Sequence, residues 1–190
     1  RDRSVSRGLG DVYKRQGVRN FIAALALLPV LLFMQRKAPK KTQTDEERKQ
    51  SRKTLWVGGV LCGLALAVAS NLQQFGISFT TVGKAGFLTA LYIVIVPILG
   101  LFLKKRVPAT VWVSVVIAAA GTYLLSVQEG FTIAPGDLLV ILCALGFSVH
   151  ILIIDHFSPM VNGVALSCVQ FLVCGILCLS LIHISEPTRH

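Results

Sequence analysis

Polar side chains inside long apolar stretches are the residues of this sequence that could do chemistry. A polar group is costly in hydrocarbon, so each one is a site candidate by default. Asn71 and Gln74 lie near the end of one apolar stretch, beside Gln73, and Lys84 begins the next. If the turn between them brings them together, Lys84 would attract an anionic or carboxylate-bearing substrate and the amides would complete its hydrogen bonds. Alternatively, Lys84 reaches outward to lipid headgroups while the amides bond backbone groups.

His150 is a second candidate, because it lies in the middle of another apolar stretch. A histidine that titrates near neutral pH could couple proton movement to transport. The alternative is a neutral histidine that bonds across a helix interface. Asp155 and His156 follow at the end of the same stretch, where polar residues are usually just solvated.

Catalytic and metal-ligating patterns are not found in the sequence. It contains no HExxH, no phosphate-binding GxxxxGK[ST], no GxSxG and no pair of carboxylates within an apolar stretch. Cys174 and Cys178 share a helix face, but no histidine or second cysteine pair is placed to complete a zinc site. All five cysteines fall in apolar runs, where a buried thiol is the ordinary interpretation: Cys62, Cys143, Cys168, Cys174 and Cys178. We therefore predict no enzyme, no cofactor and no metal.

Six apolar stretches must position these side chains. Only 15% of the residues are charged, against roughly 25% in soluble proteins. Residues 85–103 and 109–127 carry no charge, and at 1.5 Å rise per residue each reaches about 28 Å, the thickness of a bilayer's hydrocarbon core. The sequence therefore predicts an all-α membrane protein, a polytopic bundle of transmembrane helices. The predicted spans are 18–35, 55–75, 85–103, 109–127, 138–154 and 161–178.

The basic residues predict how the spans are threaded. A net charge of +10 would suggest nucleic acid if it were spread over a folded surface, but Lys and Arg concentrate in the two ends and in loops 36–53 and 104–106. Loop 77–84 holds one basic residue and loop 128–137 none. Basic loops stay on the cytoplasmic side. We therefore expect a multi-pass protein of the cell inner (plasma) membrane without a nucleic-acid partner. Loops 36–53 and 104–106 would be cytoplasmic, and loops 77–84 and 128–137 would be external.

The two ends of the chain do not read as native protein. One legal back-translation of residues 179–189 has a reverse complement that encodes residues 6–16. Such complementarity is typical of a sequencing adapter read through at both ends of a fragment. The alternative is a basic arm and a polar tail. We predict that residues 1–16 and 179–190 are non-native adapter-like peptides, and that 17–178 is an internal piece of a longer protein.

The run VGKAGFLTALY at residues 82–92, continued to Pro97, resembles the middle of an EamA-like domain from the drug/metabolite transporter superfamily. Two further runs, GTYLL at 121–125 and CALGFS at 143–148, also resemble this domain. The resemblance implies a ten-helix carrier, built as two five-helix inverted repeats, that moves small metabolites, amino acids or drugs by alternating access. Residues 17–127 would form most of the first repeat without its first helix, and 128–178 the start of the second.

The resemblance also implies that Tyr92 and Gln170 point into the bundle. The candidate substrate-binding set is then Asn71, Gln74, Lys84, Tyr92, His150 and Gln170. Many family members carry an acidic residue where this chain has the basic loop 104–106, so a mechanism that needs that carboxylate does not transfer. We expect an exporter or permease, with a small-molecule substrate and membrane lipids as partners. The sequence is also compatible with a homodimer. The alternatives are a membrane scaffold without transport and an intramembrane lipid-modifying enzyme.

Overall fold

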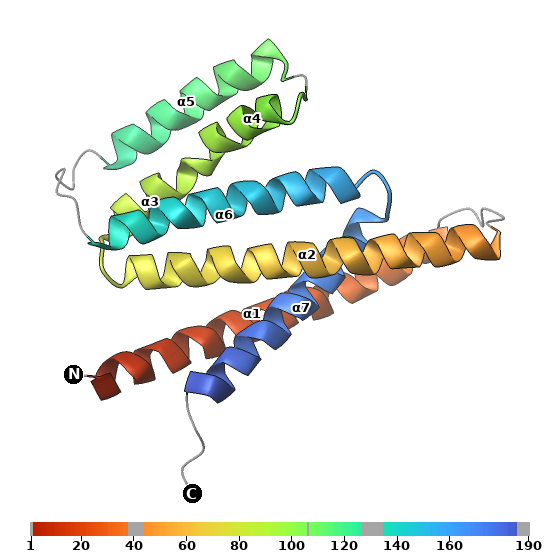
Figure 1. Cartoon of the computed structure of the whole chain (residues 1–190), viewed down its shortest axis with the longest axis horizontal. Helices are drawn as coiled ribbons and strands as arrows, with labels where there is room; N and C mark the ends of the chain where they lie inside the picture. The colour runs from red at the N-terminus through yellow and green to blue at the C-terminus, as the bar shows by residue number, and fades with distance from the viewer. Residues whose placement is uncertain (1, 38–43, 106, 127–134, 186–190) are drawn as a thin grey trace, which may run out of the picture. The chain divides into compact units, whose positions relative to one another are not determined.

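The computed structural model describes residues 2–37, 44–105, 107–126 and 135–185, all of which form helices or the turns between them (Figure 1). The predicted all-α fold is confirmed for these residues. Most of loop 128–137, Arg106, and residues 38–43 of loop 36–53 lie outside the described part. The helices are α1 (Asp2–Lys37), α2 (Asp45–Ile77), α3 (Val82–Ala90), α4 (Tyr92–Phe102), α5 (Ala109–Ser126), α6 (Pro135–Phe157) and α7 (Gly163–Ser185).

Among the described residues, each predicted span is largely helical. Within the described residues, five helical stretches are long and apolar enough to cross a membrane, and Ala109–Gly121 is a shorter apolar helix. Predicted span 85–103 is two consecutive helices, because the N–H of Leu91 donates to the carbonyl of Leu88, three residues back (3.3 Å), instead of four. Pro97 has no N–H to give to the carbonyl of Ile93, so α4 lacks one further backbone bond.

Helix α2 begins ten residues earlier than the predicted span at 55, since it starts at Asp45. The local sequence explains the start. The N–H of Thr44 donates to the Glu47 carboxylate (3.1 Å), which is half of a capping box. Acidic residues in the first turn also favour the positive end of the helix dipole. The basic loop 36–53 is therefore partly helical, continuous with the span that follows.

The chain divides into two compact units. We call Arg1–Ala67 with Ile153–His190 the terminal unit, and Val68–Leu152 the central unit. In the terminal unit α1 and α7 lie side by side (Figure 1). The Asn20 amide, buried between them, donates to Cys174 Sγ (3.3 Å) and to the carbonyl of Gln16 (2.9 Å). Cys178 is buried in the same core.

Small residues bring α2 against α7, because small side chains let two helices approach closely. A Cβ added at Gly59 would collide with Val169, and one added at Gly63 would lie 2.7 Å from Val173 Cβ. Without a hydrophobic drive between helices in lipid, such close approach is what holds them together. Gly59 and Gly63 of α2 therefore let the backbone of this helix pack directly against side chains of α7.

In the central unit, α4 and α5 lie side by side as a helical hairpin (Figure 1). The turn opens with a Schellman motif, since the N–H of Lys104 donates to the carbonyl of Leu101 and the N–H of Lys105 to that of Gly100, both at 2.9 Å. Lys104 has a φ of 57°, in the left-handed region. Pro108 directly precedes α5, where its missing N–H costs nothing because the first N–H groups of a helix have no partner within it.

Candidate functional site

A buried ion pair joins two helix starts in the central unit. Lys84 Nζ lies 3.1 Å from Asp137 Oδ2, and the Thr80 hydroxyl donates to Asp137 Oδ1 at 2.6 Å. The side chains of Lys84 and Asp137 are only 16% and 10% exposed. Both carboxylate oxygens are thus engaged, and the lysine has a specific counter-ion at close range.

Helix capping fixes the position of Lys84. Thr81 has extended backbone and caps α3, with its side chain accepting from the N–H of Lys84 (3.4 Å). Lys84 therefore sits in the first turn of α3, where a cation opposes the helix dipole. Asp137 sits in the first turn of α6, where a carboxylate is favoured. The Asp137 carboxylate therefore interacts favourably with the dipole of α6, and it also neutralises the Lys84 charge, which the dipole of α3 disfavours.

Gly136 allows this approach. A Cβ added at Gly136 would lie 2.5 Å from the carbonyl oxygen of Gly76 and 2.9 Å from the carbonyl carbon of Phe79. Both contacts are backbone, so no side-chain rotation can relieve them. Only glycine lets the start of α6, and with it Asp137, come so close to the turn that precedes α3.

Replacing Gly136 with alanine is expected to push α6 away from that turn and to destabilise the chain by about 2 kcal/mol, the usual cost of forcing an extra group into packed structure. The measurement is the thermal unfolding midpoint of the purified chain in detergent, followed by circular dichroism. Gly86→Ala is the matched control, because nothing lies within 4 Å of a Cβ added there. Equal midpoints for the two variants would contradict the close-approach explanation.

Further polar groups of the central unit lie on α2 and α3. Gln73 Nε2 donates to the Thr89 hydroxyl (3.2 Å) and links α2 to α3. Asn71 Oδ1 is buried, and no hydrogen-bond partner for it is found among the described residues. A buried acceptor left unbonded costs free energy, so this amide is a candidate for contact with a polar ligand group.

Tyr92 lines a cavity of about 420 Å³ within the central unit. This volume lies in the range of small-molecule sites, which are mostly apolar with a few polar groups. Its ring also packs at a tilt against Phe147, with centroids 6.3 Å apart. The remaining lining residues come from α4, α5 and α6, and only two of them carry hydroxyl groups: Ile93, Val96, Pro97, Thr110, Val111, Ser114, Val115, Ala118 and Ile151.

The structure regroups the predicted site residues. Lys84 pairs with Asp137, which also accepts a hydrogen bond from Thr80. The amide that bonds across to α3 is Gln73 instead of Gln74, which is half-buried. His150 is buried on α6 directly before Ile151, which lines the cavity. Gln170 is buried on α7 in the terminal unit. The substrate-binding roles of these residues remain predictions.

Sequence reasoning missed Asp137, although a signal was present. Loops 77–84 and 128–137 were both predicted to be external, and each carries a charge at its far edge, Lys84 in one and Asp137 in the other. Opposite charges at one membrane level are natural partners, since neither is stable alone in hydrocarbon.

Comparison with known proteins agrees with this helical arrangement. The sequence model of the EamA-like transporter family matches residues 11–127. An uncharacterized transporter of Archaeoglobus fulgidus is 37% identical over 110 residues, which are 57% of this chain and 35% of that protein. The chain thus spans about a third of the length of the relative it matches. No solved structure matches it.

Proposed function

The chain belongs to the EamA-like transporter family, and on that premise we propose that it is part of a carrier that moves a small solute across the plasma membrane by alternating access. Residues 17–127 would supply most of the first inverted repeat, and 128–178 the start of the second. The A. fulgidus relative bears the name of a transporter, and the five long apolar helical stretches support a multi-pass protein.

The observation that carries the proposal further is the ion pair of Lys84 and Asp137. Both charges are nearly withdrawn from solvent, and an ion pair with well-packed surroundings contributes little net stability, so a role beyond stability is the better explanation. A carboxylate on the solute would replace Asp137 as the counter-ion of Lys84. An amino acid would satisfy both residues, because its ammonium group can pair with the released Asp137.

The other proposed contacts would serve the rest of the path. Lys84 and Tyr92 are eight positions apart along α3 and the start of α4, about 12 Å at the helical rise of 1.5 Å per residue, so a small solute would contact them in succession. The cavity beside Tyr92 would take the apolar part of the solute. Asn71 and Gln74 would bond its polar groups near Lys84. His150, buried on α6, completes the proposed set within the central unit. The proposed role of Gln170, buried on α7 of the terminal unit, rests on the family resemblance alone.

The test is solute flux in vesicles reconstituted with the full-length protein to which this chain belongs. We expect saturable uptake of a carboxylate-bearing solute, found by screening labelled amino acids and organic acids, with protein-free vesicles as the control. Conversion of a membrane lipid without flux would instead indicate a lipid-modifying enzyme. Neither flux nor conversion would indicate a scaffold, and each of these two results would overturn the carrier proposal.

A further inference from the structure

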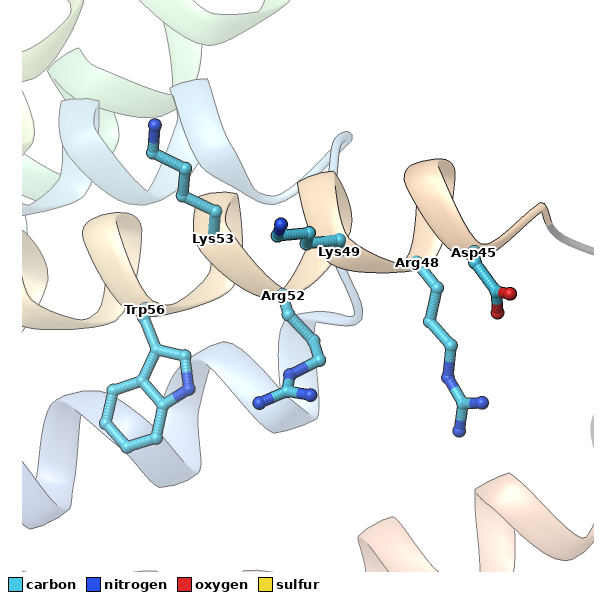
Figure 2. Close-up of a pocket in the computed structure, with 6 residues that line it drawn as sticks. All are labelled: Asp45, Arg48, Lys49, Arg52, Lys53 and Trp56. Carbon is cyan, nitrogen blue, oxygen red and sulfur yellow. The ribbon is translucent and has the colours of Figure 1, made fainter.

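A basic pocket lies on the first turns of α2, in the terminal unit (Figure 2). Its volume is about 760 Å³. Arg48, Arg52 and Trp56 are spaced four residues apart, and Figure 2 shows their side chains on the same side of the helix. The full lining, which we call the basic pocket, is Asp45, Arg48, Lys49, Arg52, Lys53 and Trp56.

The charges in the basic pocket are predominantly positive. All four cationic side chains are exposed, and no ion pair with a carboxylate is recorded for them among the residues that the structure describes. Like charges four residues apart repel, as Arg48 and Arg52 must. Asp45 is the single acid in the lining. A bound anion would relieve this repulsion.

The position of Trp56 indicates where that anion would come from. Its side chain is 55% exposed, and it stands where the apolar part of α2 begins. Tryptophan at such a position marks the membrane–water interface. Arg52 lies about 6 Å beyond it along the helix, which matches the depth of the polar headgroup layer on either side of the hydrocarbon core. In a membrane-spanning α2, the basic pocket would therefore lie at the level of the lipid headgroups.

We propose that the basic pocket binds the headgroup phosphate of an anionic phospholipid in the leaflet that faces residues 36–53. The planar guanidinium groups of Arg48 and Arg52 would each donate paired hydrogen bonds to phosphate oxygens. Trp56 would pack against the glycerol and upper acyl chain. A zwitterionic lipid binds less well, because its own ammonium group is repelled by four cations. The proposal does not depend on what the carrier transports.

The test measures lipids bound to the purified chain by native mass spectrometry in neutral detergent. Phosphatidylglycerol should bind at least tenfold more tightly than phosphatidylcholine of equal chain length, and this preference should shrink in high salt. Arg48→Gln with Arg52→Gln should weaken phosphatidylglycerol binding by roughly tenfold to thirtyfold, from the usual contribution of each basic residue near an anionic surface. Both side chains are exposed, so circular dichroism should show unchanged helicity.

Lys104→Gln with Lys105→Gln is the matched control, because it removes the same charge from another exposed basic turn. It should change binding less than twofold. An equal loss in this control, or equal binding of the two lipids by the unaltered chain, would overturn the proposal. Soluble glycerol phosphate should not compete at concentrations equal to the lipid. If it competes fully, the pocket is a site for a free phosphate compound and the lipid assignment is wrong.

Discussion

Replacing Lys84 with alanine is expected to destabilise the protein by about 3 kcal/mol, because it removes the cation that pairs with the buried Asp137 carboxylate. Lys84→Met combined with Asp137→Leu should cost much less, since no buried charge is then left unpaired. The measurement is the unfolding midpoint of the purified chain in detergent for both single variants and the double variant. Equal losses for Lys84→Ala and for the double variant would show that the pair is not coupled.

The same substitution in the full-length protein is expected to reduce transport of the carboxylate-bearing solute by at least tenfold, about the worth of one charge-assisted contact. Lys84→Arg keeps the charge and is the control for position, with an intermediate loss expected. If Lys84→Ala leaves both the rate and the substrate preference of transport unchanged, Lys84 does not contact the substrate.

Replacing Gly63 with leucine is expected to separate α2 from α7 and to cost more than about 3 kcal/mol, the upper end for overpacking in a well-packed core. The Cβ alone would lie 2.7 Å from Val173 Cβ and 3.0 Å from the carbonyl oxygen of Gln170, so a leucine has no room. The measurement is the thermal midpoint together with the elution profile of the purified chain in detergent.

Gly121→Leu is the matched control for Gly63→Leu, because it places the same side chain in an apolar helix where nothing lies within 4 Å of an added Cβ. It should leave both readouts nearly unchanged. A comparable loss in the control would mean that leucine at any glycine of these helices is harmful, and that the contact of α2 with α7 is not the cause.

The apolar lengths were enough to predict the helices, because the bilayer sets how long an uncharged helix must be. Charge counts could not predict that α2 starts at Asp45, since they indicate the compartment of a loop and say nothing about its conformation. The capping pattern from Thr44 to Glu47 carried that information locally.

The pairings inside the bundle were less predictable. Lys84 and Asp137 are 53 residues apart, so their contact depends on how the helices of the central unit pack. Gln73 and Gln74 differ by one position, yet one residue turns the side chain by about 100° around a helix. Only the packed structure shows that Gln73 is the residue that reaches Thr89.

The interrupted backbone between α3 and α4 has a mechanical consequence. At Leu91 the helical bond is the shorter three-residue kind, and two residues later the carbonyl of Ile93 receives no bond from Pro97. Bending stiffness in a helix comes from its ladder of backbone bonds, so this segment flexes more easily than an unbroken helix of equal length. Lys84 lies before this segment and Tyr92 lies within it, so bending there would change the direction of α3, and with it the position of Lys84, relative to α4.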